Sequence, residues 1–314
     1  MDKLKLGVIG VGAMGQHHAR VYSEFPDVEL VGVSDADAAR AEGIASSYRT
    51  KFFKDANELL AKVDAVSIAV PTTLHKKLAL EAFKKGKSAL IEKPIASSLT
   101  DADEMIKAAK GVTFMVGHIE RFNPAVAELR KIMAKEQIIR LEARRFGPFM
   151  PRATNVDVVL DLMIHDIDVA RCLFNSEPSK IQAIGGKAFS DKLDYATAIM
   201  KFGETDAVLS ANRITQKKIR ELEVTSKKEF LQLDYLNQTL DINRSSVPEF
   251  ITQRGNVTYK HQNVVEKIDV PKSEPLKLEL RAFVDSVRSG TEPQVSGEEG
   301  KKNLQVAFDI LKKI

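Results

Sequence analysis

Residues 4–15 read LKLGVIGVGAMG, an apolar run that leads directly into three closely spaced glycines. The spacing of these glycines is the G-x-G-x-x-G pattern, which is typical of a strand that turns tightly into a helix. The first glycine permits the turn, the second lets a diphosphate approach the backbone, and the third lets helix and strand pack closely. The stretch therefore predicts a dinucleotide-binding turn at the positive end of a helix. Its predicted cofactor ligands are Gly10, Gly12, Ala13, Met14 and Gly15.

A carboxylate follows at the position that this kind of site requires. Asp35 stands after the next apolar run, Val28–Val33, and 20 residues after Gly15. A carboxylate there accepts hydrogen bonds from a ribose and repels a 2′-phosphate, so the sequence predicts NAD as the cofactor in preference to NADP. An ordinary glycine-rich turn has no need of this carboxylate. Asp37 is a second candidate for the role, but its place at the start of a helical segment is typical of an N-cap.

Up to about residue 117, short apolar runs alternate with amphipathic, helix-like stretches. Strands that are apolar along their whole length are buried on both faces, which is typical of a parallel sheet covered by helices. Residues 1–120 are therefore predicted to form an NAD-binding Rossmann domain with a doubly wound α/β fold. The predicted strands are Leu4–Ile9, Val28–Val33, Ala65–Val70, Ser88–Ile91 and Thr113–Val116, and the predicted helices are Met14–Phe25, Ala36–Ser46, Leu74–Lys85 and Asp101–Ala109.

The pattern changes after residue 120, where strand-like runs come to follow one another without intervening helices. Several of these runs alternate apolar and polar residues, which indicates an antiparallel sheet with one face against helices. The predicted helices are Pro124–Met133, Val156–Phe174, Pro275–Ser289 and Glu298–Lys313. The predicted strands are Ile138–Phe146, Ile181–Phe189, Tyr195–Phe202, Ala207–Ile214, Arg220–Thr225, Glu229–Tyr235, Thr239–Asn243 and Val264–Val270.

This second part, residues 121–314, is predicted to be an α+β domain for substrate binding and oligomerisation. Its large, mostly antiparallel sheet leaves one face open, and an open sheet face is often an assembly surface. We therefore expect a homodimer or a homotetramer that forms through this face. The last predicted helix, about 298–313, is expected to pack back on the first domain.

The composition argues against several classes of protein. The chain has 314 residues, 44% of them hydrophobic, yet no apolar run approaches the ~20 residues that span a membrane. The net charge of +4 comes from scattered lysines, without the basic stripe and interleaved aromatic residues that bind nucleic acid. Cys172 is the only cysteine, which excludes an internal disulfide and a zinc site of several thiolates. Met1 leads through two charged residues into a strand, so we expect no signal peptide and a cytoplasmic location.

A lysine stands where ligands of such folds bind. Glu92, Lys93 and Pro94 follow the predicted strand Ser88–Ile91, at the carboxyl edge of the sheet. A lysine beside a nicotinamide ring hydrogen-bonds a reacting hydroxyl or donates a proton to it. From the residues alone, a solvated surface lysine is the more common interpretation of such a position.

A carboxylate and an imidazole share one face of a predicted helix. Asp161 and His165 are four residues apart, which places them about 40° apart around an α-helix. A carboxylate beside an imidazole raises its basicity and fixes its orientation. The pair is equally well interpreted as a helix-surface contact, and a zinc site is disfavoured because no convincing third ligand is present.

Further motifs accompany the glycine turn: VPTTLH at residues 70–75, EKP at 92–94, DLMIH at 161–165 and ELRAFV at 279–284. With this set the chain resembles the Gfo/Idh/MocA family of sugar and inositol oxidoreductases over almost its whole length. The resemblance implies that Lys93, Asp161 and His165 form the catalytic group. It also implies that other residues line the NAD site, namely Val70, Pro71, Thr72, His75, Glu92 and Lys93.

Two more stretches, GHIERFNP at residues 117–124 and RFGPF at 145–149, resemble the branch of the family that acts on UDP-N-acetylglucosamine or its glucuronate relative. That resemblance implies oxidation of the C3 hydroxyl of the sugar to a ketone. In this branch an acidic residue and a glycine are expected where Asn155 and Asp157 stand. Guanidinium groups pair bidentately with phosphate. The predicted substrate ligands are Lys93, Arg121, Asn123, Arg145, Arg152 and His165.

Two other functions fit the same residues. One is the same family chemistry on an unmodified polyol such as inositol or glucose. The other is a non-catalytic, NAD-binding regulatory protein, which has no need of Lys93, Asp161 and His165 together. In each case the expected partner is a small molecule, with no nucleic acid, membrane or metal ion.

Overall fold

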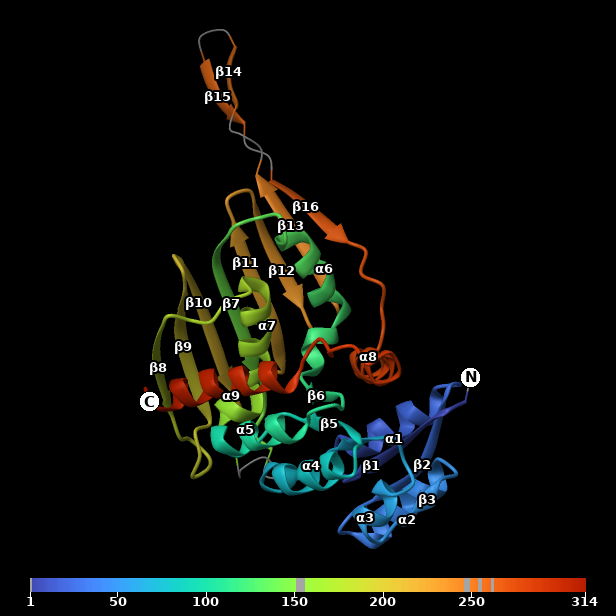
Figure 1. Ribbon diagram of the computed structural model, residues 1–314. Helices are drawn as coiled ribbons and strands as arrows, with labels where there is room; N and C mark the ends of the chain where they lie inside the picture. Colours follow the sequence, from blue (N-terminus) through green and yellow to red (C-terminus); the bar gives the residue numbers. More distant parts are fainter. Residues whose placement is uncertain (1, 151–155, 246–248, 254–255, 261–262) are drawn as a thin grey trace. The chain divides into compact units, whose positions relative to one another are not determined.

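The computed structural model describes residues 2–150, 156–245, 249–253, 256–260 and 263–314 (Figure 1). Its residues cluster into two compact units. Unit 1 comprises Met1–Phe122 and Glu274–Gln305, and unit 2 comprises Asn123–Ser273 and Val306–Ile314. The sequence-based boundary at residue 120 falls just before the end of the first segment of unit 1. The segment Glu274–Gln305, which the sequence assigned to the second domain, clusters with unit 1.

Unit 1 contains a six-stranded sheet in the order β3-β2-β1-β4-β5-β6, and every neighbouring pair is parallel. All residues of β4, β5 and β6 are buried, as expected for strands that are covered on both faces. The predicted doubly wound fold is therefore confirmed. The strands are β1 Leu4–Ile9, β2 Val28–Ser34, β3 Lys51–Phe52, β4 Ala65–Ile68, β5 Ser88–Glu92 and β6 Phe114–Gly117.

The helices of unit 1 alternate with these strands, and their starts follow ordinary capping chemistry. Asp37 caps α2 by accepting a hydrogen bond from the backbone N–H of Arg40, which confirms its predicted role. Short elements escaped prediction because two to five residues show no measurable period: β3 and α3 are examples. The helices are α1 Gly15–Glu24, α2 Ala38–Ser47, α3 Ala56–Leu60, α4 His75–Lys84, α5 Leu99–Ala108 and α8 Pro275–Ser289, with 3₁₀ turns η1 Thr72–Leu74 and η2 Ile119–Phe122.

Unit 2 contains an eight-stranded sheet in the order β16-β13-β12-β11-β7-β10-β9-β8. Neighbouring strands are antiparallel except for β7 and β10, which run parallel, so the prediction of a mostly antiparallel sheet is confirmed. The strands are β7 Ile138–Phe146, β8 Lys180–Gly186, β9 Tyr195–Phe202, β10 Thr205–Asn212, β11 Ile219–Ser226, β12 Glu229–Asp234, β13 Thr239–Ser245 and β16 Asn263–Ile268.

One face of this sheet forms a hydrophobic core with helices, and the other carries exposed side chains. The buried members of alternating strands, such as Ala198 and Leu209, pack with α6 (Pro124–Met133), α7 (Ile164–Phe174) and the end of α9 (Gly297–Leu311) (Figure 1). Ile184 and Ile199 are exposed, as an open sheet face requires. A two-stranded hairpin, β14 (Glu249–Gln253) and β15 (Asn256–Lys260), stands between β13 and β16 in the chain and was not predicted.

Within the described part of the chain, none of the helices has the length and apolar character needed to cross a membrane.

Candidate active site

In the glycine turn between β1 and α1, two of the three glycines are required by packing within the protein. Gly10 has a φ of +84°, and a Cβ there would lie 2.5 Å from the carbonyl oxygen of Ala69. A Cβ on Gly15 would lie 1.8 Å from the carbonyl oxygen of Gly10. Gly12 differs, because the nearest atom to an added Cβ is Nη1 of Arg40 at 3.8 Å. Among the described residues, no other atom comes close to this side of Gly12, as the approach of a ligand to the backbone requires.

The amino end of α1 is open to an anion. Met14 occupies the N-cap position without a side-chain hydrogen bond, and the first turn contains no acidic residue. Unpaired N–H groups and the helix dipole at such an end favour phosphate. A cleft of about 740 Å³ lies beside it. The predicted cofactor ligands that line this cleft are Gly10, Gly12, Ala13, Asp35, Val70 and Pro71.

Asp35 is tied to the glycine turn. Its Oδ2 accepts a hydrogen bond of 2.7 Å from the backbone N–H of Val11, and its Oδ1 accepts one of 2.8 Å from Asp37. Each carboxylate oxygen has two lone pairs, so both retain one for a ribose hydroxyl. The cleft, the open helix end and this carboxylate together fit the adenosine diphosphate portion of NAD.

Arg40 also lines the cleft and was missed by the sequence argument. Its guanidinium pairs with Asp37 at 2.9 Å and lies 3.8 Å from Oδ2 of Asp35. A positive charge at that distance partly offsets the repulsion that Asp35 exerts on a 2′-phosphate. The available signal was its place in the first turn of the helix after Asp35, where a long side chain reaches back toward the ribose site.

His75 joins two of the recognised motifs. The ring is buried, with Nε2 at 2.9 Å from the carbonyl oxygen of Val70 and Nδ1 at 3.0 Å from that of Pro94. Burial lowers the pKa of His75 against the opposing effect of these hydrogen bonds, so the neutral ring is favoured. The ring thus connects the turn at Val70 with the turn that carries Lys93. The Lys93–Pro94 peptide bond is cis.

Glu92 lies inside unit 1 and is not among the residues that line the described cleft. Its Oε1 is 3.0 Å from Nε2 of His18 on α1, so the end of β5 is anchored to the helix that follows the glycine turn. Burial favours the neutral acid, but the hydrogen bond with His18 and the nearby charges hold the pKa of Glu92 below its usual range. Its neighbour Lys93 is half-buried at the carboxyl end of the same strand.

In unit 2, Asp161 and His165 lie on either side of a change in helix type. The predicted regular helix from Val156 is wrong at its start, because Val159–Met163 form a π-helical turn before α7 begins at Ile164. The turn is wider than an α-turn but keeps a similar apolar period, so the sequence pattern does not reveal it. Both side chains are half-buried. Single π turns inside α-helices are frequent at functional sites.

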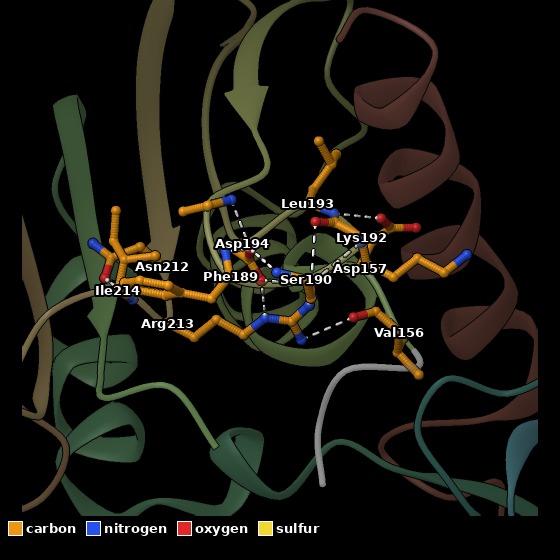
Figure 2. Close-up of polar contacts among 11 residues, drawn as sticks. Val156, Asp157, Phe189, Ser190, Lys192, Leu193, Asp194, Asn212, Arg213 and Ile214 are labelled. Carbon is orange, nitrogen blue, oxygen red and sulfur yellow. Dashed lines mark hydrogen bonds and ion pairs between the residues drawn. The ribbon is translucent and has the colours of Figure 1, made fainter. Parts of the chain in front are cut away.

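A buried ion pair fixes the segment that enters this helix. Figure 2 shows the Arg213 guanidinium between the carboxylate of Asp194, at 2.8 Å, and the carbonyl oxygen of Val156, at 2.9 Å. The Asp157 carboxylate accepts a hydrogen bond from the backbone N–H of Leu193 at 2.9 Å. Asp157, which stands where the family pattern predicts a glycine, therefore holds two loops together. Asn155 lies outside the described residues.

The Asp194 carboxylate is the centre of this arrangement. Burial alone would favour the neutral acid, but backbone N–H groups of Ala188 and Phe189 and the Arg213 guanidinium hold its pKa well below the usual range. A carboxyl whose pKa is lowered by folding contributes stability that is present above its ordinary pKa of about 4 and is lost as the pH falls toward the folded value.

Replacing Asp194 with alanine is expected to destabilise unit 2 by about 3–5 kcal/mol, because it leaves the buried Arg213 charge without its partner. Denaturant unfolding followed by circular dichroism at pH 7 measures this change. Asp206 is a matched control, since its side chain is 51% exposed and pairs with Lys201 at 3.6 Å. Asp206→Ala is expected to cost less than about 1 kcal/mol. Equal losses for the two variants would contradict the assignment.

The predicted substrate ligands occupy different environments. Asn123 is buried, caps α6 by accepting from the N–H of Ala125, and donates to the carbonyl oxygen of Tyr235 at 3.1 Å. Arg145 is buried, pairs with both carboxylate oxygens of Asp166 at 2.8 Å, and lies 5.0 Å from the centre of the Tyr235 ring. Both side chains serve the fold of unit 2, which argues against direct contact with a ligand.

For the other two arginines among the predicted substrate ligands, the structure gives less information on their environment. Arg121 is buried in η2 of unit 1. Arg152 lies outside the described residues. Among the residues that the structure describes, no group of three or more histidine, cysteine, aspartate or glutamate side chains is arranged to hold a metal ion.

Comparison with known proteins places these features in a family context. Residues 4–118 match the model described as "Oxidoreductase family, NAD-binding Rossmann fold", and residues 139–231 match the GFO/IDH/MocA C-terminal domain. The chain is 34% identical to the UDP-N-acetylglucosamine 3-dehydrogenase of Acidithiobacillus ferrooxidans, over 99% of this chain and 97% of that protein. A solved structure of that enzyme matches with a TM-score of 0.90 and covers 100% of this chain and 98% of its own. The inositol 2-dehydrogenase of Rhizobium meliloti is 29% identical over 97% of this chain and 94% of that protein.

Proposed function

The chain belongs to the Gfo/Idh/MocA family of NAD-binding oxidoreductases, and from this premise we propose that it oxidises C3 of a UDP-N-acetylhexosamine to a ketone. It is an NAD-dependent oxidoreductase that acts on CH–OH groups. The observation that carries the choice of substrate is the full-length similarity to a UDP-N-acetylglucosamine 3-dehydrogenase, at 34% identity and a TM-score of 0.90. The inositol dehydrogenases are more distant, at 29% identity or less over comparable lengths.

In the proposed reaction, His165 accepts the proton of the sugar hydroxyl while the carbon gives up a hydride. NAD supplies the hydride acceptor. Asp161 orients the imidazole and stabilises it when it is charged. Lys93 hydrogen-bonds the same oxygen and favours the developing alkoxide. The π turn supports these roles, because it presents Asp161 just before His165 on a segment that Arg213 and Asp157 hold in place.

We also propose that the protein acts in the cytoplasm as a homodimer or homotetramer. The open face of the unit 2 sheet supports this assembly, since apolar side chains such as Ile184, Tyr195 and Ile199 are exposed on its strands. Sedimentation of the purified protein as a monomer would remove the oligomer from the proposal.

A panel of substrates tests the proposed function. The purified protein is mixed with NAD and one candidate substrate, and NADH formation is followed by absorbance. We expect product from UDP-N-acetylglucosamine or UDP-N-acetylglucosaminuronate and none from myo-inositol. Product from myo-inositol alone would select the polyol dehydrogenase. NAD binding without product from any compound would select a regulatory protein.

A further inference from the structure

A second cavity lies in unit 2, next to the proposed catalytic carboxylate. It measures about 300 Å³ and is lined by Gly147, Asp161, Arg213, Lys218 and Arg220, among others. None of its basic residues belongs to the motifs that identified the family. Its walls therefore add information on the ligand that the motifs do not contain.

The sheet topology explains why these residues meet. Strands β7 and β10 are neighbours and run parallel, so their carboxyl ends lie at the same edge of the sheet. Gly147 follows β7 and Arg213 follows β10 at this edge. Strand β11 is antiparallel to β7 and begins there, which brings Lys218 and Arg220 to the same place. The cavity is thus built on the rigid ends of three paired strands.

The basic side chains differ in what they already bind. Arg213 is paired with the buried Asp194 (Figure 2), and this ion pair holds its side chain where it lines the cavity. Arg220 donates to the carbonyl oxygens of Phe146 and Ile219, which orient its guanidinium against Gly147. A Cβ on Gly147 would lie 3.8 Å from Nη2 of Arg220, so the guanidinium lies beside this glycine with room left between them.

Lys218 is the most available cation of the cavity. Its side chain is exposed, and no hydrogen bond or ion pair joins its ammonium to another described residue. A flexible ammonium beside an oriented guanidinium is a combination suited to phosphate oxygens, since lysine acts as a point charge and arginine as a planar fork.

We propose that this cavity holds the diphosphate of the substrate, with Lys218 and Arg220 as its ligands. The inference rests on the proposed function and adds the residues that recognise the nucleotide portion. In this role Lys218 and Arg220 replace Asn123 and Arg145, whose side chains bind other residues of unit 2. The diphosphate of a nucleotide sugar lies close to the sugar ring, so its ligands and the catalytic Asp161 belong in one continuous lining.

Lys218→Ala carries the test because this exposed ammonium has no hydrogen bond or ion pair with the described residues that the variant would lose. We expect the KM for the UDP-sugar to rise about 10- to 100-fold, the cost of one charge-assisted hydrogen bond, with kcat changed much less. Inhibition by UDP is expected to weaken by the same factor, whereas inhibition by uridine, which has no phosphate, stays unchanged. Lys217→Ala is the matched control, because Lys217 is exposed and is not part of the lining.

Three results would overturn the inference while leaving the proposed function intact. The first is an unchanged KM for the UDP-sugar in Lys218→Ala. The second is an equal rise in KM in Lys217→Ala. The third is a rise in KM for UDP-N-acetylglucosaminuronate alone, which would show that Lys218 binds the carboxylate of the sugar and not the diphosphate. Failure of the wild-type protein to bind UDP or to oxidise any UDP-sugar would instead refute the proposed function. Arg220→Lys adds a second measurement, because it keeps the positive charge but loses the planar guanidinium. We expect KM to rise less in Arg220→Lys than in Arg220→Ala.

Discussion

Replacing His165 with alanine is expected to lower kcat by about 10²- to 10⁴-fold, the usual contribution of a general base. The physical reason is that the sugar hydroxyl must lose its proton as the carbon loses its hydride, and water replaces imidazole poorly in that role. The affinity for NAD is expected to stay the same, because the ligands that line the cofactor cleft all belong to unit 1. Steady-state rates and titration of NAD by fluorescence measure the two quantities separately.

A control and a pH profile sharpen this experiment. His17→Ala removes an exposed histidine that is not part of the cofactor cleft and is expected to leave kcat unchanged. In the wild type, kcat/KM should fall as the pH is lowered through the pKa of the base, and this fall should be absent in His165→Ala. An unchanged kcat in that variant would show that His165 is not the base.

Replacing Gly12 with alanine is expected to weaken NAD binding by about 10- to 100-fold without changing the stability of the protein. An added Cβ at Gly12 lies 3.8 Å from the nearest atom of the described residues, so the fold accommodates it. The methyl group instead occupies the space through which the diphosphate approaches the backbone. Titration of NAD and thermal unfolding of the free protein test the two halves of this prediction.

Gly15→Ala provides the contrast. Its Cβ would lie 1.8 Å from the carbonyl oxygen of Gly10, so the turn itself must move and both stability and NAD affinity are expected to fall. If Gly12→Ala binds NAD as tightly as the wild type, the diphosphate does not lie beside this glycine. If both variants unfold alike, the distinction between a steric and a ligand-related glycine is wrong.

The fold was largely predictable because most of its elements are long enough to show a period. Strands β7 and β9 and helices α6 and α8 have the predicted bounds. The hairpin β14–β15 was missed because β14 does not alternate, and the short alternating run of β15 does not by itself reveal a partner strand. The parallel pairing of β7 with β10 also lies beyond a sequence pattern, because strand direction depends on which strands become neighbours.

The candidate site was predictable only where its residues lie close together in the sequence and form short motifs. Gly10, Gly12 and Asp35 line the cleft because the chemistry of a dinucleotide turn depends on residues close in sequence. Glu92 and Arg145 are different, since their partners His18 and Asp166 lie far away in the chain. No local sequence pattern shows that a charged side chain will pair with a distant residue of the fold and not with a ligand. For the same reason Lys218 and Arg220 were overlooked, because three separate strands bring their cavity together.

The ring of His75 has a mechanical consequence. A neutral imidazole has one N–H, whereas here Nε2 faces the carbonyl oxygen of Val70 and Nδ1 faces those of Pro94 and Ile95, so the ring can donate from one nitrogen but not from both at once. Any displacement of the loop at Val70 that favours one donor arrangement must disfavour the other. The turn at Val70, which lines the cofactor cleft, and the turn that carries Lys93 therefore compete for the single N–H of this ring, and the tautomer of His75 links the two loops of unit 1.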